Sequence, residues 1–286
     1  MPVVTHPYAD RRAATWGLQA TNVVRSPPSP WTGRGIRIAI LDTGVDLAHP
    51  QLAARVAAAR SFASGCPVQD VIGHGTHCAG IAAGLEDTRQ RRYGIACNAE
   101  VYVGRVFDDS GGTTIADVIA GMDWALSNGC NVISMSFGTF DASPAAEFEA
   151  AGRRALDAGC LVVAAAGNNR SRVVVQPANA ESILAVGAVD NRLEVARFSA
   201  GSIARGGGAA VDLMAPGVDV YSTAPPGTYA SRDGTSMAAA HVAGIAALWA
   251  EAEGLRGWAL WQRLVGSARP LPSTSGDHLA SLVTAP

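Results

Sequence analysis

The chain of 286 residues lacks lysine altogether, so arginine supplies all 22 of its basic side chains. Against 24 acidic residues this gives a formal net charge of -2 at neutral pH. Because there is no excess of positive charge, we expect neither nucleic acid nor a membrane surface as a partner. Uninterrupted apolar runs of about 20 residues, the length that a membrane-spanning helix needs, are also missing.

The N-terminal residues lack the pattern of a secretory signal peptide, because residues 1–12 have no basic start followed by an apolar stretch. Two locations stay open. The protein is secreted if a leader has been removed, and cytoplasmic if Met1 is the natural start.

Cysteine is scarce and its count is odd, so at least one thiol must stay outside any intramolecular disulfide. The spacing of the five residues matches no zinc pattern. Cys78 lies one predicted helical turn after His74, and we interpret it as a small buried hydrophobic residue. The alternative is a thiol that makes a neighbouring site sensitive to mercurials.

Apolar residues make up 48% of the sequence, enough for one large core. Apolar runs of strand length alternate with helical patterns, and the runs are apolar on both faces, which is typical of a parallel sheet covered by helices. We therefore predict an α/β fold of three layers, doubly wound, with a mostly parallel sheet and helices on both faces. The predicted strands are 36–41, 101–107, 130–136, 161–166, 183–189, 211–217 and 220–225, and the predicted helices are 16–20, 74–85, 113–128, 144–158 and 236–252.

Three short segments place a polar residue beside glycine: Asp42 in ILDTG, His74 in GHGTH and Ser236 in GTSMA. An acid, an imidazole and a hydroxyl on separate elements are the minimum set for an activated serine. The imidazole removes the proton of the hydroxyl, and the carboxylate orients the imidazole and stabilises its cation. Taken alone, Ser236 would be read as a helix N-cap. Together, the three segments predict nucleophilic catalysis by Ser236.

The predicted topology brings these groups to one edge of the sheet. Asp42, Ser136 and Asn168 stand at or just past the ends of predicted strands, where ligand sites of open α/β sheets form. His74 and Ser236 each begin a helix, whose free N–H groups and dipole favour developing negative charge.

With its motifs in the order Asp, His, Ser, the chain resembles the subtilisin superfamily of serine peptidases, in which that order is known. The resemblance runs from about Trp16 to about Trp249. The proteinase K branch is the most similar, judged by GHGTHCAG (73–80), VFDDSGGTTIADVIAGMD (106–123) and AAGNN (165–169). It implies one peptidase domain over 1–286, with an N-terminal arm (1–30) and a catalytic core (31–286).

The resemblance assigns roles to further residues. Asn168 would donate from its side-chain amide to the oxyanion, together with the backbone N–H of Ser236. Extended peptide would pair with two segments of main chain, and small uncharged residues around the P1 pocket imply a broad or apolar preference. The substrate-binding residues so implied are Phe107, Gly111, Gly112, Ser136, Phe137, Gly138, Ala164 and Gly167.

Metal binding is expected to have no part in the chemistry. Gln51 stands where subtilisins place a calcium-ligating Asp, so we expect their strong calcium site to be absent. Asp212 matches an acidic ligand of another cation site in relatives, where carbonyls near 181–183 would complete a structural calcium site. A plain structural role for Asp212 is the alternative.

The sequence thus predicts a monomeric serine endopeptidase that acts on polypeptides through an acyl-enzyme intermediate and needs no cofactor for chemistry. Two alternatives stay open: a narrow maturation protease that trims one precursor peptide, and a non-catalytic homologue that keeps the peptide groove.

Overall fold

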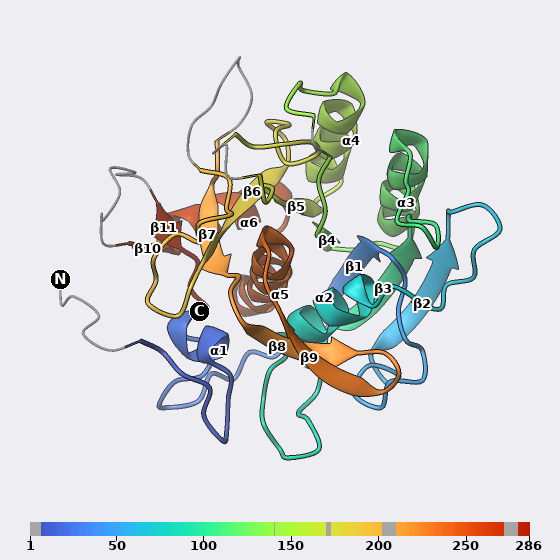
Figure 1. The fold of residues 1–286 in the computed structure, drawn as a ribbon. Coiled ribbons are helices and arrows are strands. Elements are labelled where there is room, and N and C mark those ends of the chain that lie inside the picture. Colours follow the sequence, from blue (N-terminus) through green and yellow to red (C-terminus); the bar gives the residue numbers. More distant parts are fainter. Residues whose placement is uncertain (1–6, 140, 170–172, 202–209, 272–279) are drawn as a thin grey trace.

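A computed structural model describes residues 7–139, 141–169, 173–201, 210–271 and 280–286. A nine-stranded sheet runs through the centre in the order β10-β11-β7-β6-β5-β4-β1-β3-β2 (Figure 1). All neighbouring strands are parallel except β10 and β11. The strands are β1 (Arg37–Asp42), β2 (Val56–Ser61), β3 (Glu100–Arg105), β4 (Val132–Met135), β5 (Leu161–Ala165), β6 (Leu184–Val189), β7 (Leu213–Pro216), β10 (Arg269–Pro270) and β11 (Ser281–Leu282).

Helices cover both faces of the sheet, because side chains of successive strand residues point to opposite faces. On β5, Val163 and Ala165 pack into the core shared with α2 (His74–Ala83) and α5 (Thr235–Glu253). Val162 and Ala164 pack into the other core, under α3 (Ile115–Ser127) and α4 (Ala146–Asp157). The predicted three-layer α/β fold is confirmed.

The boundaries of the predicted elements lie within two residues of those in the structure. The sequence did not reveal β2, β9 (Thr228–Arg232), β10, β11 or α6 (Gly257–Ser267). β2 is half-exposed and lacks a long apolar run, and β10 and β11 are two residues each. These three strands give too weak a pattern to be predicted.

A separate hairpin accounts for the predicted strand at 220–225. β8 (Val220–Ala224) pairs antiparallel with β9 (Thr228–Arg232), and neither belongs to the main sheet. Three residues separate the two strands, and Gly227 in that turn has φ +61°. A connection this short requires antiparallel neighbours. The hairpin lies beside α2 (Figure 1).

The N-terminal segment contains α1 (Trp16–Ala20), as predicted. Leu18 is fully buried and Trp16 is 3% exposed, so this part of the arm packs into the core. The division into an arm and a catalytic core stays a prediction.

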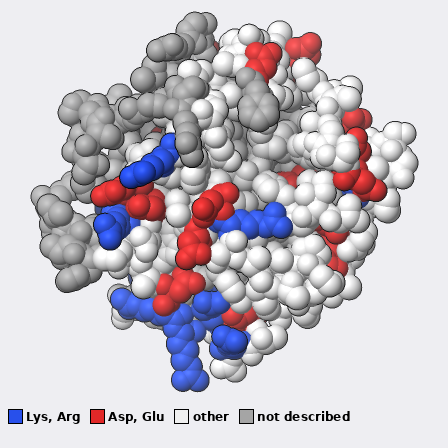
Figure 2. Space-filling view, viewed as in Figure 1, with Lys and Arg blue, Asp and Glu red and all other residues white. Residues whose placement is uncertain are grey.

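Charged side chains of both signs are mixed over the face in Figure 2. Basic side chains gather at its lower edge, over the N-terminal segment and the loop between α2 and β3. Arg91 in that loop pairs with Asp10 at 3.1 Å and Asp87 at 3.3 Å. Among the described helices, none is both long and apolar enough to cross a membrane.

Candidate active site

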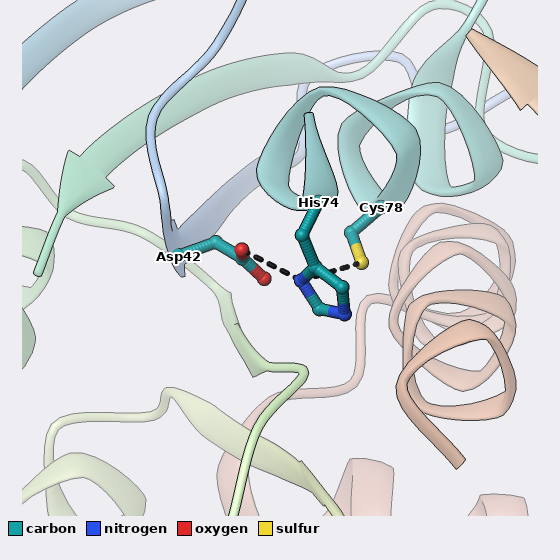
Figure 3. Close-up of side chains that lie close together, drawn as sticks. All are labelled: Asp42, His74 and Cys78. Carbon is teal, nitrogen blue, oxygen red and sulfur yellow. Dashed lines mark hydrogen bonds and ion pairs between the residues drawn. The ribbon is translucent and has the colours of Figure 1, made fainter. Parts of the chain in front are cut away.

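The first pair of the site joins the end of β1 to the start of α2. His74 Nδ1 lies 2.8 Å from Asp42 Oδ1, and Figure 3 shows the imidazole and the carboxylate side by side. Nδ1–H is then the donor, which leaves Nε2 of the neutral ring as the acceptor. The same carboxylate oxygen accepts the backbone N–H of Thr43 at 2.7 Å. Asp42 therefore fixes both the tautomer and the direction of the ring.

The charge of the His74 ring is controlled by its surroundings. Burial by itself lowers the pKa of His74, but the Asp42 carboxylate outweighs burial and holds that pKa well above the ordinary 6.5. A quarter of the His74 side chain is exposed, whereas Asp42 is fully buried. The imidazole can therefore exchange protons with a substrate while its partner carboxylate stays shielded.

A second carboxylate, that of Asp70, holds the backbone around this pair through hydrogen bonds. Asp70 is 3% exposed and accepts five hydrogen bonds of 2.7–3.1 Å, from the N–H groups of Ile72, Gly73 and Thr76 and the hydroxyls of Thr43 and Thr76. Thr43 in turn accepts the N–H of Gly75 at 2.9 Å. Asp70 thus ties the residue after Asp42 to the residues on either side of His74.

Ser236 lies in the first turn of α5, after Gly234 at φ +154°. It is 8% exposed and lines a pocket of about 150 Å³. α5 packs directly against α2, which carries His74. Among the described residues, no hydrogen bond within 3.5 Å joins the Ser236 hydroxyl to His74. Such catalytic hydrogen bonds are often long before a substrate binds.

Asn168 follows β5 and Gly167, whose φ of +113° favours glycine. Its Oδ1 accepts the backbone N–H and the hydroxyl of Thr235, both at 2.9 Å. Because Thr235 holds the oxygen, the Nδ2 group turns toward Gly234 and the pocket. An amide donor and the start of α5 thus meet at Ser236.

The pocket beside Ser236 has no charged residue in its lining. It is formed by Phe137, Gly138, Thr139, Ala165, Gly167, Asn168, Asn169, Val175, Thr235 and Ser236. Two residues expected at this pocket are not in its lining. Ala164 points to the opposite face of β5, into the core, and the buried hydroxyl of Ser136 lies 3.5 Å from that of Ser134. Ala165, the next residue of the strand, does line the pocket.

The expected second substrate segment is a tight exposed turn after β3. Asp108 Oδ1 accepts the N–H groups of Ser110 and Gly112 at 2.8 and 2.9 Å, and Gly111 has φ +83°. The Ser110 hydroxyl also donates to Asp108 Oδ1, at 2.7 Å, and together with the backbone N–H groups it lowers the pKa of Asp108. Phe107, just before the turn, meets Phe137 edge to face at 4.9 Å, so the two expected substrate segments touch.

Cys78 lies on α2 behind the imidazole. Its Sγ is 3.9 Å from His74 Nδ1, and it is fully buried (Figure 3). Burial raises the pKa of Cys78, which keeps a neutral thiol there. In the described part of the chain, Asp42, His74 and Cys78 are the one group of three side chains with metal-ligand spacing. Since Nδ1 is bound to Asp42 and the thiol is protonated, the group suits proton transfer better than metal binding.

Asp212 lies just before β7, where its Oδ2 accepts the N–H of Ala185 at 2.8 Å. Burial raises the pKa of Asp212 to about 7. Among the described residues it belongs to no group of three acidic, histidine or cysteine side chains, so a calcium ion would depend on backbone carbonyls. Calcium at Asp212 stays a prediction. In the loop that follows α2, the Asp87 carboxylate is occupied by protein donors, among them Arg91 and Tyr221.

Three residues that support the site belong to none of the predicted motif roles: Asp70, Thr235 and Arg105. Arg105 is fully buried and donates to Pro67, Gln69 and Phe107 carbonyls at 2.8 Å and to the carboxylate of Asp109. It therefore joins the loop before Asp70 to the turn at 108–112. An acidic residue shortly before the N-terminus of a helix, as Asp70 is, was a usable signal. Nothing local marks Arg105, because its partners are far apart in the sequence.

Comparison with known proteins agrees with this geometry. Residues 33–278 match the family model described as the subtilase family, peptidase S8. Over 238 residues, 83% of the chain, it is 41% identical to the alkaline protease of Alkalihalobacillus alcalophilus and to Subtilisin Savinase of Lederbergia lenta. The chain spans 60% of the length of the first and 84% of the second.

A solved structure is similar as well. The crystal structure of a cold-adapted subtilisin-like serine proteinase matches with a TM-score of 0.80 and 29% identity, over 97% of this chain and 96% of that one. The finer resemblance to the proteinase K branch stays a prediction. By its sequence motifs, its fold and these relatives, the chain belongs to the subtilase family of subtilisin-like serine peptidases.

Proposed function

We propose that the protein is a serine endopeptidase that cleaves polypeptides through an acyl-enzyme intermediate. The observation that carries the proposal is the 2.8 Å bond between His74 and Asp42, beside a pocket lined by Ser236 and Asn168. A buried carboxylate that orients an imidazole next to a helix-terminal serine is the arrangement that activates a hydroxyl.

The first half of the reaction forms the acyl-enzyme and uses His74 first as base and then as acid. His74 Nε2 takes the hydroxyl proton while Ser236 Oγ attacks the carbonyl carbon of the scissile bond. The carbonyl oxygen becomes an anion, which Asn168 Nδ2 and the N–H of Ser236 stabilise. His74 then gives its proton to the amine, the C–N bond breaks, and the amine leaves while the acyl group stays on Ser236.

Water completes the cycle. His74 removes a proton from the water that attacks the acyl-enzyme, and returns it to Ser236 Oγ when the acid departs. Asp42 remains ionised and stabilises the imidazolium formed in each half.

Substrate selection follows from the pocket and the two segments around it. Because the lining holds no charged side chain, we infer a broad or apolar P1 preference with no requirement for arginine or lysine. Main-chain pairing with 136–138 and 111–112 would hold any extended peptide. We infer that the enzyme acts as a monomer on polypeptides, and needs no metal for the chemical steps.

The test compares wild type and Ser236→Ala on casein and on a mixed peptide library, with and without chelator. We expect wild type to cleave at many apolar sites and Ser236→Ala to lose at least about 10³-fold in rate. Equal turnover by the two proteins would show that Ser236 is not the nucleophile. Cleavage of a single peptide would favour a narrow maturation protease, and no cleavage by folded wild type would favour a non-catalytic homologue.

A further inference from the structure

A guanidinium group lies beside the residue that precedes the catalytic imidazole. Arg232 ends β9, four residues before Ser236. A Cβ atom placed on Gly73 would lie 3.1 Å from Arg232 Nη2 and 3.0 Å from Pro225 Cδ. Since Gly73 directly precedes His74, the Arg232 side chain packs against the backbone that leads into the imidazole.

The backbone of Arg232 pairs with Val220 of β8, and burial together with the positive charge of Arg232 lowers the pKa of His77. Among the described residues, however, the Arg232 side chain makes no hydrogen bond, ion pair or ring contact, although it is partly buried. Neither Asp70 nor Asp233 forms an ion pair with it: Asp70 accepts five hydrogen bonds from other residues, and Asp233 accepts the N–H of Asp219 at 2.7 Å. A partly desolvated cation without a counter-charge is unfavourable, and a ligand that supplies the charge would recover that free energy.

The two residues directly before Gly73 are apolar and supply no counter-charge. The loop before Gly73 exposes Val71 and Ile72, by 62% and 37%. These two exposed apolar side chains precede the glycine on which Arg232 packs. The apolar pair and the guanidinium together suit a substrate residue with an aliphatic stem and a negatively charged end.

The position of Arg232 assigns it to one side of the scissile bond. The lining of the pocket beside Ser236 includes Asn168 but neither Gly73 nor His74. In the proposed reaction His74 delivers its proton to the departing amine, so the leaving segment must lie on the His74 side. Arg232 is therefore placed to meet residues that follow the scissile bond.

We propose that Arg232 binds a carboxylate of the leaving segment, and that the enzyme prefers peptides with Asp or Glu at the first or second position after the scissile bond. The inference rests on the proposed peptidase function. The planar guanidinium can bind a carboxylate through two parallel N–H···O bonds, which a lysine cannot do. A free C-terminal carboxylate two residues after the scissile bond has the same chemistry.

Quenched fluorescent peptides test the proposal. One pair carries Glu or Gln at the first position after the scissile bond, a second pair carries them at the second position, and all four end in an amide. A fifth peptide has Gln at both positions and a free C-terminal acid directly after them. Each is measured with wild type, Arg232→Gln, Arg232→Lys and the control Arg153→Gln, a charge loss on α4 where the side chain is 63% exposed.

For wild type, we expect kcat/KM to be about tenfold higher for Glu than for Gln in at least one pair, the size of one charge-assisted hydrogen bond. Arg232→Gln should bring the ratio close to 1, Arg232→Lys should keep part of it, and Arg153→Gln should keep all of it. A preference shown only by the free-acid peptide, and lost in Arg232→Gln, would support the carboxylate site and assign it to a chain terminus. Equal rates for all five wild-type reactions would overturn the proposal.

A fluorophosphonate separates failure of this inference from failure of the proposed function. If Ser236 is labelled and all peptides are cleaved at equal rates, only the role of Arg232 is wrong. If folded protein gives neither an adduct nor cleavage, the peptidase proposal fails, and the role of Arg232 fails with it.

Discussion

Asp42 and His74 are braced by Asp70, which accepts five hydrogen bonds, whereas Asn168 and Ser236 are held mainly through one neighbour, Thr235. The first pair lies where β1 ends and α2 begins, and the Asp42 carboxylate is fully buried. The second pair borders an open pocket, and Asn168 is exposed. The proton-transfer half is therefore ordered before substrate arrives, while the half that meets the carbonyl oxygen faces solvent.

Because of this difference, substitutions in the two halves of the site should change different properties of the enzyme. Changes in the first half should alter the pKa of His74 and the stability of the fold, because many hydrogen bonds depend on it. Changes in the second half should lower kcat with little effect on the pH dependence, because the groups concerned act on the transition state.

The largest effect is expected for Asp42→Asn. The substitution keeps the shape of the side chain but removes the charge that orients and stabilises the imidazolium, so kcat should fall on the order of 10⁴-fold. Steady-state kinetics on a peptide substrate measures it. The matched control is Asp46→Asn, another buried carboxylate on the same loop, which accepts hydrogen bonds from the N–H groups of Ala48 and Gly227 and from the side-chain amide of Gln69. A loss of similar size in the control would contradict a specific role for Asp42.

Asn168→Ala should come next, with a fall in kcat of roughly 10²–10³-fold, a figure already known for the corresponding oxyanion donor of subtilisin. Thr235→Val removes only one of the two bonds that hold Asn168 Oδ1, so its effect should be smaller, about tenfold. The two variants are compared by kcat at saturating substrate. If Asn168→Ala changed KM alone, the amide would bind substrate without stabilising the oxyanion.

Asp70→Asn should cost about 2–3 kcal/mol in the free energy of unfolding, because at least one buried donor loses its acceptor. We also expect kcat to fall about tenfold, since the joint between Asp42 and His74 loosens. Urea unfolding and kinetics on the same preparation measure both. A loss of stability with unchanged kcat and pH profile would show that Asp70 is structural and does not position His74.

Asp212→Asn should have the smallest effect, confined to the dependence of stability on pH. The folded pKa of about 7 lies above the ordinary 3.8, so Asp212 stabilises the fold fully below about pH 3.8 and loses this contribution as the pH rises through 7. The melting temperature of wild type should therefore fall more than that of the variant between pH 5 and pH 8. Added calcium should raise it at pH 8 in wild type alone if Asp212 binds the ion, and equal curves would refute both roles.

Much of the fold and of the site could be predicted because the sequence patterns that mark them lie within short segments of the chain. Asp42, His74 and Ser236 each stand beside a glycine at the end or start of a strongly apolar element, and such elements have sharp boundaries. Repeated strand and helix patterns then fix which edge of the sheet the residues share.

The rest depends on contacts between distant segments. Nothing near Thr235 shows that it will hold Asn168, and nothing near Arg232 shows that it will pack on Gly73. Ala164 and Ala165 point to opposite faces of β5, and only Ala165 lines the pocket, because neighbouring side chains of a strand alternate between its two faces.

The most direct test of the account is the pH dependence of Ser236 labelling by a fluorophosphonate, in wild type and in Asp42→Asn. Only the neutral imidazole can take the proton, and the pKa of His74 is raised by Asp42, so labelling of wild type should increase with pH through a midpoint above 6.5. In Asp42→Asn the midpoint should move lower and the maximal rate should fall. Absence of an adduct on Ser236, or the same midpoint in both proteins, would contradict the claim that Asp42 and His74 activate this serine.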